Sequence, residues 1–524
     1  MSTFQNTRPA PTSPTAASDE VVCWLNGERV TVQGDATLER LSSWLRTRRR
    51  LTGTKVACGT GDCGSCTVLV AGAHENPPRW LPVNACLGFV YQFHGSELRT
   101  IEGIGAPDWL TPLQEAMVHS HGAQCGVCTP GIVMAATAVM QDDAPTAREQ
   151  WARCLSGNVC RCTGYTAIID AAIHATVHAT TLAEHSAPDD RPAHGVPPFT
   201  DAWLAEREAL RGRPLAVGSA GCATDTATPR TIRPVTLAAA IEALVTAPHC
   251  VVTAGTTDLA LDEPPEDATW LDIGQLQELR GVDLLPADPA DPSARDVLVL
   301  GALTTWQELA SIAGQQCPPL AALLQRMGGP QVRARATVGG NVMTASPIGD
   351  LLPLLYVLET HLEFTGPTGS RQVSVREAIT GYRTVQRGPA ELLTRVRVAL
   401  PHAHEKLALE KVSRRRDMDI AALSLAAWWA RDASGRVRHV ALAAGGVGPT
   451  VLRLTDAERR LNGSPGAADD WREAAALAVH AIEARTDVRG SATYRRQVLA
   501  NLITSLATFD GPSRGTHRHR EVRP

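Results

Sequence analysis

Residues 58–66 of this chain have the sequence CGTGDCGSC, and Cys86 follows further along the chain. The loop has the spacing C-x4-C-x2-C, which with a fourth, distant cysteine is the arrangement of a plant-type [2Fe–2S] ferredoxin. Its three glycines allow the loop to wrap tightly and to direct backbone N–H groups at the sulfur atoms. A structural zinc site is the alternative, although zinc ligands usually occur as compact C-x2-4-C pairs. The pattern favours an iron–sulfur centre held by Cys58, Cys63, Cys66 and Cys86.

A second group of cysteines lies further along the chain. Cys125 and Cys128 form a C-x2-C pair, and Cys160 and Cys162 form a C-x-C pair. This spacing alone also suits zinc, and Cys154 competes as a ligand. Cys128 and Cys162 each stand just before a predicted helix start, and the positive ends of two helix dipoles would stabilise an anionic cluster. We therefore favour a second [2Fe–2S] centre at these four cysteines, with zinc as the alternative.

Composition limits the class of protein. The chain has 524 residues, of which 44% are hydrophobic, and a formal net charge of −4. This length has room for three or four domains, and the charge gives no reason to expect binding to nucleic acid or to a membrane. Met1 to Glu20 lacks the order of a signal peptide, which favours a cytoplasmic protein that does not spend its thirteen cysteines on disulfides. The isolated cysteines are predicted to be buried core residues: Cys23, Cys222, Cys250 and Cys317.

Local patterns predict the secondary structure around both cysteine groups. Two β-prone runs flank Asn26-Gly27, which predicts a hairpin, and Thr37 is expected to cap a helix that continues to Leu45. With a strand at 67–70, this order suggests a small sheet that grasps one helix. Residues 110–180 have helical periodicity, and Thr146 is expected to form a capping box with Glu149 ahead of Trp151.

The remaining chain divides by composition and periodicity. We expect a disordered tail at 1–20, a ferredoxin-like domain at 21–100, a helical domain at 101–180, an exposed proline-rich linker at 181–212, an α+β domain at 213–402, a C-terminal α+β domain at 403–510 and a tail at 511–524.

Several motifs together resemble one family. QCGVCTPG at 124–131 and CRCTGY at 160–165 resemble the second iron–sulfur domain of the molybdenum hydroxylases, the family of xanthine dehydrogenase and aldehyde oxidase. RATVGGNVMTASPIGD at 335–350 resembles the FAD-binding segment of that family, and KVSRR at 411–415 resembles its next motif. The resemblance covers residues 21 to 510.

The resemblance implies a multidomain α+β fold with a β-grasp ferredoxin domain, a helical bundle with the second cluster, an FAD-binding domain and a further C-terminal domain. It implies that the Cys58 group lies nearer the flavin and that the Cys125 group lies nearer molybdenum. Cys154 matches no ligand position. Gln124 is similar to a family glutamine that contacts the pterin of the molybdenum cofactor, which implies a surface for a molybdopterin-binding large subunit.

The resemblance also implies the flavin contacts. The resemblance assigns no catalytic residue to this chain, and Lys411 is expected near the isoalloxazine, where a cation can stabilise reduced flavin. Many relatives carry a second glycine where Thr256 stands, and Tyr382-Arg383 resembles a segment that lines the nicotinamide entrance. FAD is expected to contact two loops and this lysine: Gly255, Thr256, Thr257, Asp258, Leu259, Gly340, Asn341, Thr344, Asp350 and Lys411.

Fused iron–sulfur and flavin domains without a molybdopterin domain imply an electron-transfer subunit of the xanthine dehydrogenase type. Purine would be hydroxylated at molybdenum on a partner subunit, and electrons would pass through two [2Fe–2S] clusters to FAD and then to NAD, in a heterotetramer or larger assembly. A partner acting on an aldehyde or another N-heterocycle is the second interpretation. A zinc-stabilised, non-catalytic scaffold is the third.

Overall fold

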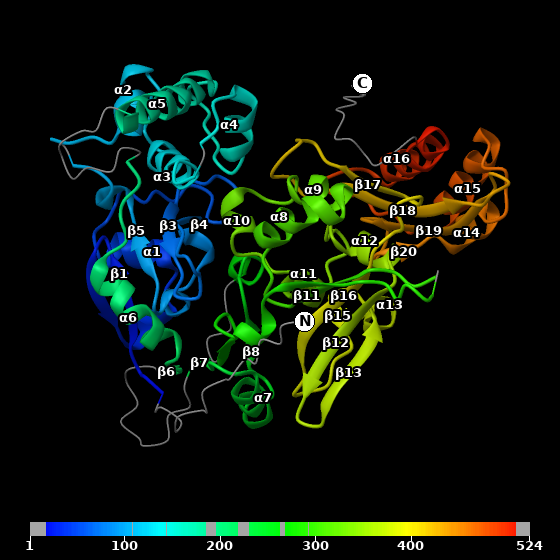
Figure 1. Ribbon diagram of the computed structural model, residues 1–524, viewed down its shortest axis with the longest axis horizontal. Helices are drawn as coiled ribbons and strands as arrows, with labels where there is room; N and C mark the ends of the chain where they lie inside the picture. The colour runs from blue at the N-terminus through cyan, green and yellow to red at the C-terminus, as the bar shows by residue number, and fades with distance from the viewer. Residues whose placement is uncertain are drawn as a thin grey trace.

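A computed structural model describes residues 17–106, 108–142, 144–184, 195–217, 230–262, 268–291 and 293–509. They form successive structural units, coloured from blue to red in Figure 1, and confirm the predicted multidomain α+β fold. The expectation for Cys222 lies outside the described residues, as does most of both predicted tails. The prediction of a disordered tail at 1–20 is wrong at Ser18. Its N–H donates to Pro214 O at 2.9 Å, because residue 18 extends a neighbouring strand. Within the described ranges, none of the helices has the length and apolar character needed to cross a bilayer.

The ferredoxin-like unit is a five-stranded sheet with the order β2-β1-β5-β3-β4, packed against one helix. The first strand pairs antiparallel with the second and parallel with the fifth. Asn26 and Gly27 form the predicted hairpin turn, with φ of 53° and 91°, as a two-residue turn of this kind requires. The elements are β1 (Val21–Leu25), β2 (Glu28–Val32), β3 (Thr67–Ala71), β4 (Leu81–Asn84), β5 (Glu97–Arg99) and α1 (Leu41–Thr47).

The helix expected to start at Thr37 begins later in the chain. Gly34–Leu38 is a 3-10 helix, within which the Thr37 hydroxyl donates to Gly34 O at 2.7 Å. Helix α1 starts only at Leu41 and has no side-chain cap. The capping prediction was therefore wrong because the Thr37 hydroxyl is used inside the preceding turn.

The helical unit contains α2 (Pro112–His119), α3 (Thr129–Val139), α4 (Arg148–Cys154) and α5 (Thr166–Glu184). The first and last of these lie side by side above the ferredoxin-like unit in Figure 1. Trp151 of α4 is fully buried in their common core. The predicted capping box at Thr146 does not form, because α4 begins after Ala147 with no side-chain hydrogen bond at its start.

Part of the segment expected to be an exposed linker is a packed helix, α6 (Asp201–Arg211). Trp203 on this helix is fully buried, and its Nε1 donates to Gly95 O at 2.9 Å. The proline-rich composition of the surrounding segment hid a helix whose apolar face covers the ferredoxin-like sheet. The residues at 185–194 lie outside the described ranges.

The third unit has two sheets, with strand orders β6-β7-β9-β8 and β10-β11-β16-β12-β13, and a small hairpin β14-β15. Its strands are β6 (Leu215–Val217), β7 (Thr231–Arg233), β8 (Val251–Thr253), β9 (Trp270–Asp272), β10 (Val282–Leu285), β11 (Val297–Gly301), β12 (Thr360–Gly366), β13 (Gly369–Ser374), β14 (Ile379–Gly381), β15 (Thr384–Val385) and β16 (Leu392–Ala399). Its helices are α7 (Leu237–Thr246), α8 (Trp306–Gln316), α9 (Pro318–Leu324), α10 (Pro330–Arg333), α11 (Val338–Thr344), α12 (Leu352–Val357) and α13 (Val375–Ala378).

The C-terminal unit packs three helices on an antiparallel sheet, with a core that includes Trp429 against Trp471. Its strands are β17 (Lys406–Val412), β18 (Leu423–Arg431), β19 (Val437–Gly445) and β20 (Leu452–Arg453), and its helices are α14 (Thr455–Leu461), α15 (Ala468–Ala481) and α16 (Ala492–Ser505). The third unit lies against the ferredoxin-like and C-terminal units on its two sides (Figure 1).

Candidate functional site

The first cysteine group lies at one end of the ferredoxin-like sheet. Cys58 and Cys63 lie in the loop that leads to β3, Cys66 immediately precedes that strand, and Cys86 lies in a 3-10 helix after β4. Thr60 N–H points at Cys58 Sγ over 3.4 Å. The loop therefore brings backbone donors to a sulfur atom, as an anionic cluster requires.

The thiols of this group are arranged in hydrogen-bonded pairs. Burial alone would raise the pKa of Cys58, but hydrogen bonds from Thr60 and Cys63 outweigh it and lower that pKa to about 7. The hydrogen bond between Cys66 and Cys86 lowers the pKa of Cys86 and raises that of Cys66. One sulfur atom of each of these pairs thus has an environment that favours its thiolate form.

The second group has the same paired arrangement in the helical unit. Cys162 Sγ and Cys125 Sγ lie 3.6 Å apart, and a hydrogen bond joins the thiols of Cys128 and Cys160. Burial raises the pKa of Cys128 to about 12, while the backbone N–H of Val127 lowers the pKa of Cys125. Cys128 is the N-cap residue of α3, as predicted from sequence.

These pairs match the chemistry of a diiron cluster. Each iron of a [2Fe–2S] centre takes only two cysteine thiolates, and inorganic sulfide supplies the other ligands. Cys154 lies apart at the end of α4 and packs at the edge of the helical core.

The two cysteine loops contact each other directly. Val159 N–H, next to Cys160, donates to Cys63 O at 3.0 Å, and Asn158 Nδ2 donates to Gly64 O at 3.1 Å. A Cβ added at Gly64 would meet Gly157 O at 2.3 Å, so only glycine permits this approach. The loops of the two cysteine groups are therefore held together by hydrogen bonds next to predicted ligands.

The third unit joins this contact through Gln331 on α10, which is 1% exposed. Its Nε2 donates to Asn158 Oδ1 at 2.8 Å and to Thr67 Oγ1 at 3.2 Å. Three structural units thus meet at one buried amide.

The structure brings the two predicted flavin loops together. A Cβ at Gly255 would lie 1.9 Å from Arg335 O, and Arg335 Nε donates to Gly255 O at 3.2 Å. Arg335 opens the segment that continues into α11, where Gly340 is exposed. In that helix the buried Asn341 Oδ1 has no hydrogen-bond partner within the described part of the chain, which leaves a polar atom available to a ligand.

The remaining predicted flavin residues have different surroundings. Asp258 Oδ2 accepts a hydrogen bond from Arg383 Nη1 at 3.0 Å, which places the Tyr382-Arg383 segment beside the first loop. Thr257 and Thr344 are half-buried, whereas Leu259 is 37% exposed.

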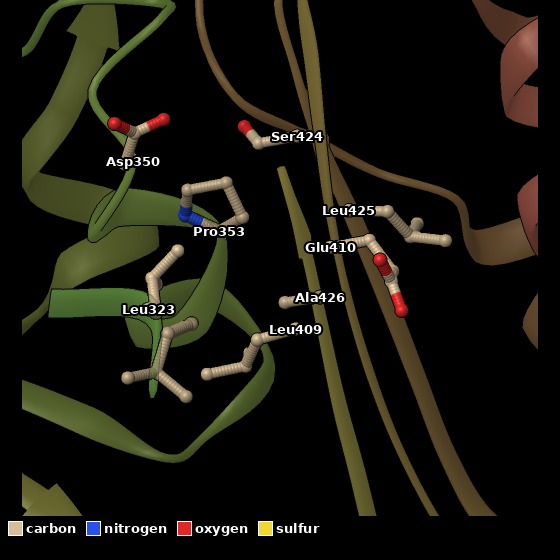
Figure 2. Close-up of a pocket in the computed structure, with 9 residues that line it drawn as sticks. Leu323, Asp350, Pro353, Leu409, Glu410, Ser424, Leu425 and Ala426 are labelled. Carbon is tan, nitrogen blue, oxygen red and sulfur yellow. The ribbon is translucent and has the colours of Figure 1, made fainter. Parts of the chain in front are cut away.

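Lys411 and Asp350 form a buried ion pair, with Nζ 2.6 Å from Oδ2. Burial raises the pKa of Asp350, while Lys411 opposes that shift. Figure 2 shows Asp350 facing Ser424, and Asp350 Oδ1 and Ser424 Oγ have no hydrogen-bond partner among the described residues. The space between them does not admit a water-sized sphere, so these side chains line a packing gap and not a ligand pocket.

Comparisons with known families cover these same regions. Residues 25–90 match a 2Fe-2S iron-sulfur cluster binding domain, and residues 100–173 match a [2Fe-2S] binding domain. Residues 226–402 match the FAD binding domain in molybdopterin dehydrogenase, and residues 409–508 match the CO dehydrogenase flavoprotein C-terminal domain. The chain belongs to the molybdenum hydroxylase family. It contains the two iron–sulfur domains and the flavin domain of that family, with the electron-transfer role that they carry.

Individual relatives are similar to long stretches of this chain. Xanthine dehydrogenase 2 of Arabidopsis thaliana is 29% identical over 500 residues, which are 85% of this chain and 36% of that protein. Aldehyde oxidase 1 of Bos taurus is 28% identical over 496 residues, which are 87% of this chain and 36% of that protein. This chain spans just over a third of the length of these curated relatives. The solved carbon monoxide dehydrogenase from Hydrogenophaga pseudoflava is 27% identical with a TM-score of 0.48, and the match covers 52% of this chain and 94% of that one.

Sequence reasoning did not identify the residues that connect the three units. Four buried polar residues bind a neighbouring unit, and each lies in ordinary sequence without a spacing pattern: Asn158, Gln331, Gln92 and Arg233. Gln331 and Asn158 stand beside recognised motifs. That proximity was the available signal, but it says nothing about the partner of either side chain.

Proposed function

We propose that this chain is the iron–sulfur and flavin subunit of a xanthine dehydrogenase. Electrons from hydroxylation of hypoxanthine or xanthine at molybdenum on a partner subunit would leave through it to NAD. The order of cofactors along the route would be the Cys125, Cys128, Cys160 and Cys162 cluster, then the Cys58, Cys63, Cys66 and Cys86 cluster, then FAD. Bound iron–sulfur clusters carry single electrons, and bound FAD exchanges one or two.

The observation that carries this proposal is the arrangement of eight thiols in two groups whose loops touch. Each group supplies two thiolates to each of two irons, and positive-φ glycines such as Gly59 and Gly126 keep the space beside the loops free of side chains. The hydrogen bond from Val159 to Cys63 O holds the groups in succession.

The helical unit has an exposed face that favours binding of a large partner subunit. Gln124, Cys125 and Cys162 are exposed there, and so are the hydrophobic side chains of Val127 at 44% and Tyr165 at 40%. Apolar groups around exposed metal ligands favour a surface that a second subunit covers. We propose that the molybdopterin-binding subunit docks on this face and that the complex is a heterotetramer or larger, in the cytoplasm.

Cofactor analysis of the full chain tests the first step. We expect four irons, four acid-labile sulfides and one FAD per chain, as two [2Fe–2S] clusters and one flavin require, with visible absorption of both cofactor types. A colourless protein that contains zinc would support a zinc-stabilised scaffold instead and would overturn the proposal.

Turnover tests the second step. The isolated chain is expected to reduce dyes with NADH and to leave xanthine unchanged, whereas the complex with its partner oxidises xanthine with NAD. Because the Bos taurus aldehyde oxidase matches the chain about as well as the xanthine dehydrogenases do, aldehydes and N-heterocycles are the second candidate substrates. A complex that oxidises these compounds and not purines would assign the partner to that second class.

A further inference from the structure

The segment that follows Cys86 lies directly against the first predicted flavin loop. The Thr256 hydroxyl lies 2.8 Å from Leu87 O, 2.8 Å from Gly255 O of its own loop and 3.0 Å from Gln92 Oε1, and its one hydrogen is shared among these acceptors. Gln92 Nε2 donates back to Ala254 O at 3.0 Å. These hydrogen bonds join residues 86–93, which start at a predicted cluster ligand, to residues 254–258, which are predicted to bind the diphosphate of FAD.

Thr256 has an unusual backbone conformation for this task. Its φ is 58°, in the left-handed region that a β-branched residue rarely adopts, and it is 5% exposed. A residue keeps such a conformation where its surroundings determine it, and such sites concentrate at functional loops. In this conformation the hydroxyl reaches the carbonyl of Leu87 in the neighbouring unit while it stays within hydrogen-bond distance of Gly255 O in its own loop.

We propose that Thr256 is a positioning residue that couples the flavin loop to the Cys86 segment, so that FAD bound at 254–258 also orders residues 86–93. This inference rests on the proposed function, because it takes the loop as the FAD site and Cys86 as a ligand. The coupling is reciprocal, so an ordered Cys86 segment also favours FAD binding. Binding of FAD and ordering of the segment that holds the first cluster would then favour each other.

The surrounding contacts make this hydrogen bond separable from docking of the two units. Arg233 donates to His94 O at 3.1 Å and to Gln92 O at 3.2 Å, and its Nε lies 3.0 Å from Asp272. This buried arginine continues to hold the units together when the Thr256 hydroxyl is removed. A change confined to residues 86–93 can therefore be assigned to the lost hydroxyl.

Four variants of the full chain test the proposal. Thr256→Ser keeps the hydroxyl, and Thr256→Val removes it at the same side-chain size. Thr256→Gly removes it and also accepts the positive φ, so this variant answers the question where valine disturbs folding. Thr304→Val is the matched control, because the Thr304 hydroxyl is also buried and donates to a carbonyl, Gly281 O at 2.8 Å, but within the flavin unit.

The measurement is hydrogen–deuterium exchange of the chain, with its clusters present, before and after FAD is added to the deflavinated protein. In the wild type, Thr256→Ser and Thr304→Val, FAD is expected to slow exchange in both 254–260 and 86–93. In Thr256→Val and Thr256→Gly, FAD is expected to protect 254–260 only, with about fivefold faster exchange in 86–93, the change expected from loss of one hydrogen bond.

Two results would contradict different claims. Protection of 86–93 that persists in Thr256→Val and Thr256→Gly, or that is absent from the wild type while 254–260 is protected, overturns the coupling alone. If FAD protects neither segment of the wild type, the predicted flavin site itself is wrong.

Discussion

Replacing Lys411 by methionine is expected to destabilise the contact between the third and C-terminal units. Lys411 lies on β17 and Asp350 immediately ahead of α12, so their ion pair joins two units. The lysine side chain is 1% exposed and that of Asp350 is 11% exposed, and Lys411 Nζ also donates to Arg326 O at 3.0 Å. Lys411→Met therefore leaves a buried carboxylate without its main partner.

The size of the effect follows from this burial. Removal of one member of a buried ion pair typically costs about 3–5 kcal/mol. Arg326 still attracts the Asp350 carboxylate, so we expect a loss near the lower limit, about 3 kcal/mol. The double variant Lys411→Met with Asp350→Leu should recover most of that loss, because well-packed apolar side chains often replace a buried pair at little cost.

The loss should also depend on pH in a defined direction. Without Lys411, the pKa of Asp350 in the folded chain rises further above its value in the unfolded chain, because burial is less opposed. The protonated, neutral carboxyl is tolerated at low pH, and the penalty develops as pH rises through the raised pKa. The difference in stability between Lys411→Met and the wild type is therefore larger at pH 8 than at pH 5.

Local hydrogen exchange is the appropriate assay, since a chain of several units does not unfold in one two-state step. Exchange of 406–412 and 350–357, corrected for intrinsic rates, gives the local opening free energy at each pH. A loss below about 1 kcal/mol, or a loss that does not shrink at low pH, would refute the view that this pair bridges the two units as buried charges.

Three further predictions concern the other units. Burial lowers the pKa of His94 to about 3. Because His94 takes up a proton only in the unfolded chain, the free energy of unfolding of the ferredoxin-like unit should fall by about 2 kcal/mol between pH 7 and pH 5. Denaturation of His94→Asn across that range should not show this loss. Cys66→Ser should remove about half of the acid-labile sulfide, and Cys154→Ser should remove none by the same chemical analysis. Alanine at Gln331 and at Asn158, singly and together, should give a coupling energy of about 1 kcal/mol in a double-mutant cycle on exchange of 63–67; additive losses would show that the buried amide does not join the loops.

Local patterns predicted the parts of the fold that depend on short stretches of chain. The Asn26-Gly27 turn forms as predicted because left-handed φ values at two successive residues are a local requirement. The cysteine groups could be recognised because ligand spacing is a local property of the sequence. The prediction that Thr37 and Thr146 cap helices was wrong, because a threonine hydroxyl can bind any of several nearby backbone groups and the sequence does not show which of them it uses.

The contacts between units could not be predicted, because they join residues far apart in the chain. Gln331 and Asn158 are separated by 173 positions, and Thr256 and Leu87 by 169. Neither pair has a composition or a spacing that marks it. The departure from the family pattern at Thr256 was visible in the sequence, but its use became clear only when the neighbouring carbonyl was known.

The same cross-unit hydrogen bonds bear on the proposed order of the redox centres. Each bond adjoins a predicted ligand: Val159 next to Cys160 binds Cys63 O, and Thr256 in the flavin loop binds Leu87 O next to Cys86. The first cysteine group therefore contacts the second group through its loop, and Leu87, the residue after Cys86, contacts the flavin loop. These contacts, one from a backbone N–H and one from a side-chain hydroxyl, place the Cys58 group between the other cysteine group and the predicted flavin loop. Changes that loosen either bond should thus affect transfer to one neighbour and leave the other contact intact.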